Sequence, residues 1–277
     1  MTDKYAVIGN PIAHSKSPLI HATFAKQFEI TDTPQDISYD PIFAPLDGFE
    51  TTVCDLIKQG YKGANVTVPF KLEAYHLCDY LYSTATSSSA RAVNTLIFND
   101  NRNEIEGTNT DGIGLRNDIE QNLGFSIENK DILILGAGGA ADGILISLIG
   151  AKSITIANRT LEKALRMVTG LYDTHDYQAR INKFEELNTS FDLIVNATST
   201  GLSGETLPLS DSIFNSNTLA YDLMYGRETA FMAQARANGA QVADGLGMLV
   251  EQAAEAFHLW RGVRPQTAPV IAMLRNN

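Results

Sequence analysis

The sequence predicts an α/β fold in two domains, an N-terminal α/β domain followed by a doubly wound domain of the Rossmann type. Short apolar stretches typical of buried strands alternate with stretches of helical spacing along most of the chain. One of these strands, residues 132–135, leads into a glycine-rich turn at residues 136–141, and a helical stretch follows at residues 144–149. This order of elements begins a βαβ unit and predicts a parallel sheet. A length of 277 residues allows two domains of ordinary size.

Composition excludes several classes of protein. With 44% hydrophobic residues, the chain has ample material for a packed core. A formal net charge of −11 argues against a nucleic-acid partner, which favours a basic face. The longest apolar runs are shorter than the roughly 18 residues that a membrane span needs, and the charged N-terminus does not resemble a signal peptide. We therefore expect a cytoplasmic protein with no membrane partner.

The cysteines give no sign of a metal site. Only Cys54 and Cys78 are present, without the C-x-x-C spacing or the nearby histidines of a ligand set. We expect two ordinary thiols in a reducing compartment and no bound metal.

The first 110 residues alternate between strand and helix patterns. In the first helix Ser17 is a good N-cap, and Pro18 would take the first helical position. Gly60 closes the second helix, and Pro69 opens the third. The predicted elements are a strand at 5–8, a helix at 17–28, a strand at 37–43, a helix at 47–58, a strand at 64–68, a helix at 69–81, and strands at 92–98 and 104–108.

The rest of the chain forms the second domain and a helical C-terminus. A helix that begins at Asp111 links the two domains. The predicted elements after the glycine-rich turn are a strand at 153–157, a helix from Leu161, strands at 191–195 and 219–223, and helices at 248–260 and 265–274. The last two helices follow the last strand pattern, so periodicity alone allows them to cap either domain.

The turn at residues 136–141 fits the pattern G-x-G-x-x-A that opens a dinucleotide-binding βαβ unit. In such a unit Gly136 makes the tight turn, and Gly138 lets the backbone approach a pyrophosphate at the helix N-terminus. The small Ala141 allows the helix to pack closely on the strand. Many strand-to-helix turns are rich in glycine, but this one has the strand, the helix and a second strand at the expected distances. It predicts a dinucleotide site.

The end of the next strand indicates which dinucleotide binds. An NAD site usually has Asp or Glu there, bonded to the ribose 2′-hydroxyl. Here the strand runs into Asn158, Arg159 and Thr160, and Lys163 follows four residues after Arg159. A guanidinium offers a planar fork of donors that suits a 2′-phosphate. The alternative is a solvated surface pair, but after a glycine turn of this kind we favour NADP.

Lys71 conflicts with a local rule of helix formation. Pro69 marks the start of a helix, so Lys71 falls in the first turn, where the helix dipole disfavours a cation. An ammonium destabilised in this way is suited to donate and accept a proton near neutral pH. The alternative, far more common for a single lysine, is a solvated side chain.

Three further polar clusters, with four residues in all, have two readings each. Asp111 is placed either to cap its helix or to hydrogen-bond a substrate hydroxyl and pair with Lys71. Ser15 and Ser17 surround a helix N-terminus like a carboxylate-binding nest; capping explains Ser17 equally well but does not explain Ser15. Gln252 lies on the apolar face of its helix, either as a satisfied core residue or as a group that points into a cleft.

Taken together, these clusters closely resemble the shikimate dehydrogenase family. The matching segments follow the family's order along nearly the whole chain, and the set is far more specific than any one motif. They are G-N-P-I-A-H-S-K-S-P at 9–18, G-A-N-V-T-V-P-F-K at 63–71, A-V-N-T at 92–95, N-T-D-G at 109–112, G-A-G-G-A at 136–140, N-R-T at 158–160, N-A-T-S at 196–199 and D-G-L-G-M-L-V-E-Q-A-A at 244–254.

The resemblance implies a reversible hydride transfer between NADPH and the C3 carbonyl of 3-dehydroshikimate, on the pathway to aromatic amino acids. It implies that Lys71 is the catalytic lysine and Asp111 its paired aspartate. It assigns the substrate carboxylate to Ser15 and Ser17. The other substrate contacts that it implies are Thr67, Asn94, Tyr225 and Gln252.

The resemblance also implies how the chain is divided. A substrate domain would comprise residues 1–110, completed by C-terminal helices at 246–277, and an NADP-binding Rossmann domain would comprise residues 111–245. The active site would lie in the cleft between them. The implied NADP contacts are Gly136, Gly138, Gly139, Ala140, Asn158, Arg159, Thr160, Lys163, Thr198 and Met248.

The sequence departs from the family pattern at three positions. Arg91 stands where glycine is usual, Thr108 where aspartate is common, and Asp142 where the family often has arginine. Asp142 adds a negative charge near the glycine turn, so we expect a weaker preference for NADP than in relatives with a basic residue there. A dehydrogenase that also accepts quinate and NAD remains an alternative, as does a non-catalytic regulatory protein, although intact Lys71 and Asp111 count against the latter. Both a monomer and a homodimer remain open.

Overall fold

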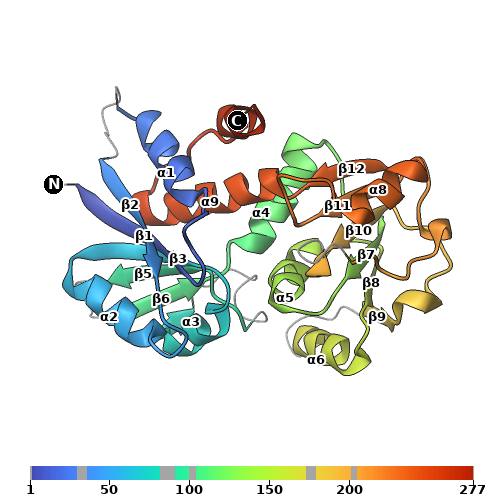
Figure 1. Ribbon diagram of the computed structural model, residues 1–277, viewed down its shortest axis with the longest axis horizontal. Helices are drawn as coiled ribbons and strands as arrows, with labels where there is room; N and C mark the ends of the chain where they lie inside the picture. The colour runs from blue at the N-terminus through green and yellow to red at the C-terminus, as the bar shows by residue number, and fades with distance from the viewer. Residues whose placement is uncertain are drawn as a thin grey trace. The chain divides into compact units, whose positions relative to one another are not determined.

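The chain forms two compact units, each with a six-stranded sheet (Figure 1). The computed structural model describes residues 2–29, 36–81, 91–99, 104–172, 179–200 and 205–276. Unit 1 comprises Met1–Gly114 and Val250–Asn277, and unit 2 comprises Leu115–Leu249. Both sheets are flanked by helices, which confirms the predicted α/β fold class.

The unit boundaries fall inside two helices. Helix α4 (Asp111–Asn117) contains the first boundary, and helix α9 (Leu246–Arg261) contains the second. The boundaries expected from the sequence, after residues 110 and 245, lie four residues before each of these.

The sheet of unit 1 is mixed, with the strand order β2-β1-β3-β5-β6-β4. Its strands are β1 (Asp3–Gly9), β2 (Ile37–Phe43), β3 (Tyr61–Val66), β4 (Tyr80–Leu81), β5 (Thr95–Asn99) and β6 (Glu104–Thr108). Strands β1, β2 and β3 are parallel, whereas β5 runs antiparallel to both β3 and β6. The N-terminal end of β5 therefore lies at the same sheet edge as the C-terminal ends of β3 and β6. That edge carries Thr67, Asn94 and Asp111.

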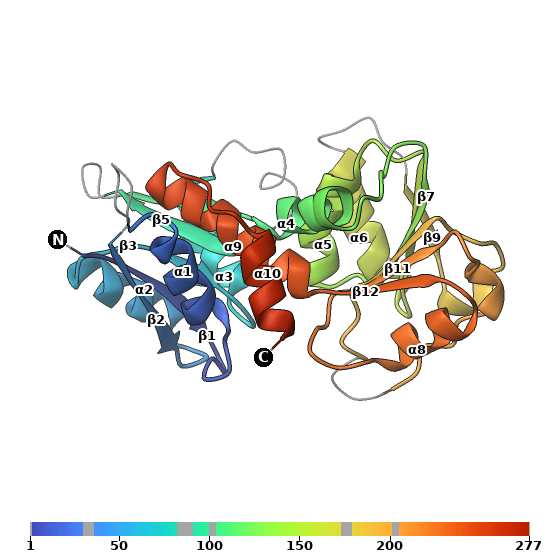
Figure 2. The same cartoon turned by 90° about the horizontal axis from the view of Figure 1, so that it is seen from above.

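Both faces of this sheet are covered. Successive residues of a strand point to opposite sides, so each strand contributes to both cores. Ala6 and Ile8 of β1 join a core with helices α2 (Phe49–Lys58) and α3 (Lys71–Leu77). Tyr5 and Val7 belong to a second cluster with Trp260 of α9. Helix α1 (Ser17–Lys26) lies on this second face, and helix α10 (Ala268–Arg275) packs beside α1 (Figure 2).

The sheet of unit 2 is wholly parallel, with the order β12-β11-β10-β7-β8-β9. Its strands are β7 (Asp131–Leu135), β8 (Ser153–Ala157), β9 (Ala179–Asn182), β10 (Leu193–Asn196), β11 (Leu219–Asp222) and β12 (Gln241–Asp244). The chain enters at β7, winds outward to β9, and then returns to β10 on the other side of β7. This change of direction makes a topological switch point between β7 and β10, where doubly wound sheets bind their ligands.

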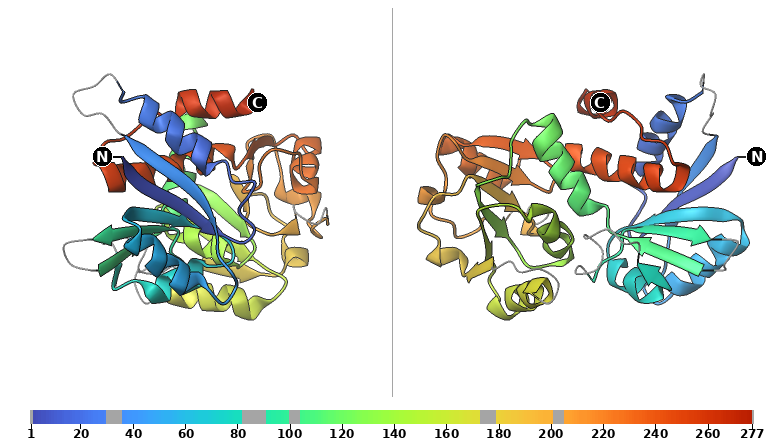
Figure 3. Two further views of the ribbon diagram at one scale, coloured as in Figure 1. Left: turned by 60° about the vertical axis from the view of Figure 1, so that its left-hand side comes forward. Right: turned by 180° about the vertical axis from the view of Figure 1, so that it is seen from behind.

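Helices cover both faces of the second sheet (Figure 3). Ile132 and Ile134 of β7 pack with α5 (Gly139–Leu145), the 3₁₀ turn η2 (Ile146–Leu148) and α6 (Leu161–Tyr172). The π-helical turn η1 (Asp118–Asn122) contributes Ile119 to the same core. Leu133 and Leu135 face the opposite core with α8 (Ala230–Ala237) and the 3₁₀ turns η3 (Phe184–Glu186) and η4 (Asp211–Ile213).

Several elements differ from the sequence-based expectation. The helix expected to reach Leu81 ends at Leu77, because Cys78 takes an extended conformation and the Asp79 carboxylate accepts a hydrogen bond from the backbone N–H of Ile105 in β6. Ser17 is not the N-cap of α1; it is already helical, and Lys16 precedes it as the cap residue. Strands β9 and β12 and helix α8 were not predicted. The two strands are short sheet edges, where half-exposed residues give little apolar pattern.

Within the described ranges, no helix is long and apolar enough to cross a membrane.

Candidate active site and cofactor pocket

Lys71 and Asp111 are hydrogen-bonded to each other in unit 1. Lys71 is the first residue of α3, after β3, and Asp111 is the first residue of α4, after β6. The Lys71 Nζ donates to Asp111 Oδ2, and the two side chains are 22% and 12% exposed. A lysine and a carboxylate from strand ends 40 residues apart in sequence thus form a largely shielded ion pair.

Asp111 does not cap its helix. Its Oδ1 accepts a hydrogen bond of 2.8 Å from Asn94 Nδ2, and its backbone N–H donates to Asn109 Oδ1 at 2.9 Å. Asn109 is held in turn, since its Nδ2 donates to the carbonyl oxygen of Ala92 at 2.8 Å. The Asp111 carboxylate is therefore turned toward Lys71 and Asn94, with both oxygens engaged.

Gln252 belongs to the same group of side chains. It is only 9% exposed, and its Oε1 lies 3.3 Å from the hydroxyl of Thr110, the residue before Asp111. Gly114 allows this contact: a Cβ there would lie 2.8 Å from the backbone nitrogen of Gln252. This contact places the Gln252 side chain beside Asp111 in unit 1.

Ser15 and Ser17 are joined locally. The backbone N–H of Ser17 donates to Ser15 Oγ at 3.2 Å, so the Ser15 hydroxyl is bonded to the first backbone N–H of α1 although Lys16 is the cap residue. Ser17 is buried, and Ser15 is half-buried. Thr67 follows β3, and its backbone N–H donates to the carbonyl oxygen of Ile8 at 2.9 Å, which attaches it to the end of β1. All three follow C-terminal ends of parallel strands, the usual position of ligand contacts in α/β sheets.

Three further buried residues, which the sequence reasoning missed, are hydrogen-bonded to one another near Asn94. Tyr39 donates to Asn65 Oδ1 at 2.6 Å, and Asn65 Nδ2 donates to Thr95 Oγ1 at 3.0 Å. A signal was present, since Asn65 and Thr95 are polar residues inside apolar strand patterns. Such residues are costly to bury unless they are hydrogen-bonded.

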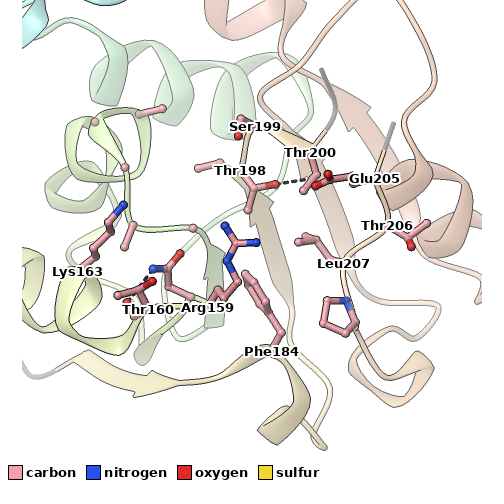
Figure 4. Close-up of a pocket in the computed structure, with 18 of the residues that line it drawn as sticks. Arg159, Thr160, Lys163, Phe184, Thr198, Ser199, Thr200, Glu205, Thr206 and Leu207 are labelled. Atoms are coloured by element: carbon pink, nitrogen blue, oxygen red, sulfur yellow. Dashed lines mark hydrogen bonds between the residues drawn. The ribbon is translucent and has the colours of Figure 1, made fainter. Parts of the chain in front are cut away.

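Unit 2 contains a pocket of about 470 Å³ above the glycine turn (Figure 4). This size is typical of a site for a small molecule or cofactor. Nine of the ten expected cofactor residues line it, and Met248 does not; its backbone N–H donates to Tyr221 Oη at 3.3 Å. The nine are Gly136, Gly138, Gly139, Ala140, Asn158, Arg159, Thr160, Lys163 and Thr198.

The glycines fit a closely approaching ligand. Gly136 has φ +106°, and a Cβ there would lie 3.1 Å from the carbonyl oxygen of Ala197. At Gly138 and Gly139 a Cβ would meet no atom within 4 Å. Their backbone therefore faces open space, as a turn that cradles a pyrophosphate must.

Charged groups of both signs line the same pocket. Figure 4 shows the Arg159 side chain pointing into it, between Thr198 on one side and Phe184 on the other. Lys163 is exposed on α6, and Asn158 Nδ2 donates to the carbonyl oxygen of Thr160 at 2.8 Å. Glu185 and Glu205 also line the pocket, and the sequence reasoning missed both.

Tyr225 follows β11 in unit 2 and does not line this pocket. It is half-buried, and burial raises the pKa of its hydroxyl. Among the described residues, no three His, Cys, Asp or Glu side chains are grouped as they would be to hold a metal ion.

The fold and the pocket define a class of protein, the two-unit α/β dinucleotide-binding proteins. Within that class, the chain belongs to the shikimate dehydrogenase family. Three family models match it: "Shikimate dehydrogenase substrate binding domain" at residues 7–96, "Shikimate / quinate 5-dehydrogenase" at 118–203 and "Shikimate 5'-dehydrogenase C-terminal domain" at 245–275. The resemblance inferred from the motifs is therefore confirmed.

Individual relatives agree along their whole length. The chain is 53% identical to the shikimate dehydrogenase (NADP⁺) of Methylobacillus flagellatus, over 99% of both chains. The crystal structure of an Ael1 enzyme from Pseudomonas putida superposes with a TM-score of 0.90 at 46% identity, covering 99% of this chain and 98% of that one. A shikimate 5-dehydrogenase of Thermus thermophilus, in complex with NADP(H) and shikimate, has a TM-score of 0.86 at 29% identity, covering 99% of each chain.

Proposed function

We propose that this protein catalyses the reversible, NADPH-dependent reduction of 3-dehydroshikimate to shikimate, a step of aromatic amino-acid biosynthesis. The observation that carries the proposal is the Lys71–Asp111 pair, shielded at a sheet edge that also bears hydroxyl and amide side chains. A small polyhydroxylated acid needs many directed hydrogen-bond partners and little apolar wall. Membership of the family supports the same conclusion.

We assign proton transfer to Lys71. In the direction of reduction its ammonium donates a proton to the carbonyl oxygen of the substrate, and in the reverse direction its neutral amine accepts the hydroxyl proton. Asp111 accepts a hydrogen bond from Lys71 Nζ, so it orients the amine and balances its charge. Asp111 would also accept a hydrogen bond from a substrate hydroxyl.

The remaining substrate contacts divide by chemistry. We assign the carboxylate to Ser15 and Ser17, which follow β1; Ser17 is the first residue of α1. Thr67, Asn94 and Gln252 are assigned to ring hydroxyls. We also assign Tyr225 to the substrate. In this proposal residues 1–110 and the C-terminal helices form the substrate domain.

The pocket of unit 2 is the proposed NADP site, and residues 111–245 are the proposed cofactor domain. When bound, NADPH supplies the hydride. Arg159 and Lys163 would bind the 2′-phosphate, because a guanidinium forms short, paired bonds to phosphate oxygens. The remaining pocket residues assigned to the cofactor are Gly136, Gly138, Gly139, Ala140, Asn158, Thr160 and Thr198. Met248, which does not line the pocket, is also assigned to the cofactor.

A dehydrogenase of broader range is the second candidate, favoured by the family model that shikimate and quinate dehydrogenases share. Quinate has a saturated C1 with an additional hydroxyl beside the carboxylate. If Ser15 and Ser17 hold a planar C1, that hydroxyl would clash or leave a donor unpaired, at a cost of roughly 1–3 kcal/mol. A non-catalytic cofactor-binding protein is the third candidate, and the intact Lys71–Asp111 pair argues against it.

One assay separates these candidates: reduction of NADP⁺ and of NAD⁺, each with shikimate and with quinate. We expect kcat/KM for shikimate with NADP⁺ to exceed that for quinate by at least about tenfold, equivalent to about 1.4 kcal/mol. Comparable constants for the two acids would favour the second candidate. Binding of NADP⁺ without turnover of either acid would leave only the third.

We further propose that the protein acts in the cytoplasm, as a monomer or a homodimer. The free thiols of Cys54 and Cys78 are compatible with a reducing compartment. Sedimentation analysis of the purified protein would distinguish the two assemblies.

A further inference from the structure

A chain of buried side chains leads from the interior of unit 1 to the Asp111 carboxylate. Tyr39 donates to Asn65 Oδ1 at 2.6 Å, and Asn65 donates to Thr95 Oγ1 at 3.0 Å. Thr95 then donates to Asn94 Oδ1 at 2.9 Å, and Asn94 donates to Asp111 Oδ1 at 2.8 Å. Thr95 is fully buried, and Asn65 and Asn94 are 6% and 3% exposed. Tyr39, Asn65 and Thr95 have no role in the function proposed above.

Two backbone groups fix the direction of this chain. The backbone N–H of Thr110 lies 2.8 Å from Asn94 Oδ1 and can only donate, so the amide nitrogen of Asn94 must face Asp111. The carbonyl oxygen of Asn94 lies 3.3 Å from Asn65 Nδ2 and can only accept, so Asn65 must face it with its nitrogen. Asn65 therefore presents its oxygen to Tyr39, which must donate.

Thr95 is the only link in this chain with a hydroxyl that both accepts and donates within it. It receives the Asn65 amide proton and gives its own proton to Asn94 Oδ1, which as a carbonyl oxygen can only accept. All four bonds consequently have their donors directed toward Asp111. Hydrogen bonds aligned in this way polarise one another, and in a shielded interior the effect on a carboxylate is stronger than in water.

We propose that Thr95 is a positioning residue for the reaction, acting through Asn94 on the carboxylate of Asp111; this rests on the proposed function of the Lys71–Asp111 pair. The aligned donors hold Asp111 in one orientation, with its second oxygen free to bind Lys71 Nζ. Preorganised dipoles of this kind favour a reaction because they need no rearrangement as charge moves. The residue touches neither substrate nor cofactor in this role.

Two substitutions at position 95 separate positioning from packing. Thr95→Val keeps the shape of the side chain and removes the hydroxyl, whereas Thr95→Ser keeps the hydroxyl and removes the methyl group. For Thr95→Val we expect kcat to fall about tenfold, equivalent to about 1.4 kcal/mol and within the range for a buried group that loses its partner. For Thr95→Ser we expect kcat within about twofold of the wild type. If Thr95→Val is as active as Thr95→Ser or more so, Thr95 serves packing and the proposal is wrong.

Thr155→Val is the matched control. Thr155 is another buried threonine, in β8 of unit 2, and does not line the cofactor pocket. The same chemical change there should leave kcat unchanged. An equal loss of kcat in Thr155→Val and Thr95→Val would show a general effect of burying valine and would overturn the proposal.

Tyr39→Phe tests whether the residues act as one chain. Removing the first donor should lower kcat about threefold, because it weakens the bonds that follow. In the Thr95→Val background the chain is already broken, so Tyr39→Phe should cause no further loss. If the two effects multiply, the residues act independently, and the proposal that they act as one hydrogen-bonded chain is refuted.

A spectroscopic measurement tests the proposal without relying on turnover. In protein labelled with carboxyl-¹³C aspartate, the Asp111 signal is the one that Asp111→Asn lacks. Its chemical shift should move in Thr95→Val and return toward the wild-type value in Thr95→Ser. An unchanged chemical shift would refute the proposed action of Thr95 on Asp111, even in an active enzyme. Lack of shikimate turnover by the wild type, with the signal moving as expected, would instead refute the proposed function alone.

Discussion

The polar groups around Lys71 and those of the cofactor pocket are built in opposite ways. In unit 1, Lys71 and Asp111 are mostly shielded from solvent, and hydrogen bonds within the protein hold the carboxylate from both sides. In unit 2, Arg159 and Lys163 are exposed, and among the described residues neither side chain has a hydrogen bond or ion pair. One set is fixed before any ligand arrives, and the other is available to be ordered by one.

This difference follows from what each set must do. Proton transfer depends on the orientation of a single pair of groups, and a fixed, shielded pair avoids rearrangement during the reaction. Binding of a phosphate depends on total charge and reach, which long, solvated cations supply, although salt screens them. We therefore expect changes in the first set to alter the rate, and changes in the second to alter cofactor affinity in a salt-dependent way.

The largest effect is expected at Lys71. Lys71→Ala removes the proposed acid and base, so kcat should fall by about 10²–10⁴-fold. Shikimate binding should be largely retained, because the hydroxyl and amide contacts remain. Steady-state kinetics with a separate calorimetric measurement of shikimate affinity checks both expectations. Lys58→Ala is the control, since Lys58 is an exposed lysine of the same unit paired only with Asp55 in the described structure. Near-normal turnover of Lys71→Ala would refute the mechanism.

Arg159 should show the second-largest effect. Arg159→Ala removes the charge-assisted contact proposed for the 2′-phosphate, so the Kd for NADP⁺ should rise about 30-fold, or about 2 kcal/mol. The Kd for NAD⁺, which lacks that phosphate, should change less than about twofold. Fluorescence titration with both cofactors measures this. Arg166→Ala is the control, because Arg166 is an exposed arginine of α6, the helix that follows Arg159, and does not line the pocket. Equal weakening of both cofactors by Arg159→Ala would contradict the assignment.

The same contrast explains which parts of the site the sequence predicts. The glycine turn and Arg159 follow from local order, since strand, turn, helix and strand end are consecutive in the chain. The Lys71–Asp111 pairing was an open alternative, because it depends on β5 running antiparallel between β3 and β6. That arrangement brings the ends of all three strands to one sheet edge.

The rest of the network requires sheet register, which no local pattern provides. Thr95 lies opposite Asn65 because β3 and β5 pair in one particular register, and Tyr39 comes from β2, two strands away. Glu205 lines the pocket from a segment with no strand or helix pattern of its own. Such contacts are set by tertiary packing, so the periodicity of the sequence does not predict them.

His21 should make unit 1 sensitive to acid. It is fully buried against Tyr39, with ring centroids 4.1 Å apart, and within the described residues neither ring nitrogen has a hydrogen-bond partner. Burial lowers the pKa of His21 to about 3. Below pH 6.5 the unfolded chain binds a proton that the folded protein does not, so the free energy of unfolding falls as the pH decreases toward 3. At about pH 5 the loss from this one group is about 2 kcal/mol.

The variant His21→Phe isolates this contribution. It keeps an aromatic ring in the cluster and removes the titrating group, so packing effects should be the same at every pH. The free energy of unfolding of the variant relative to the wild type should therefore increase by about 2 kcal/mol between about pH 7.5 and about pH 5. Urea denaturation at the two pH values measures it, with the exposed His76→Phe as the control. A difference that does not change with pH would mean that His21 is protonated in the folded protein.

The smallest effect is expected at Asp142, whose removal should slightly increase the affinity of the exposed pocket for NADP⁺. Asp142 lies in the first turn of α5, three residues after Gly139, which lines the pocket. Two unit charges roughly 8–10 Å apart in water interact by only about 0.5 kcal/mol before screening. Asp142→Asn should therefore tighten NADP⁺ binding only about twofold in about 10 mM salt, and less in about 150 mM, where the Debye length falls to about 8 Å. The substitution also removes a negative charge that the helix dipole favours, so stability should fall by about 0.3–1 kcal/mol. Titrations of wild type and variant at both ionic strengths, with thermal melts, test this. Tightening that is independent of salt would show that Asp142 acts through local structure, and weaker binding would show that its charge aids the site.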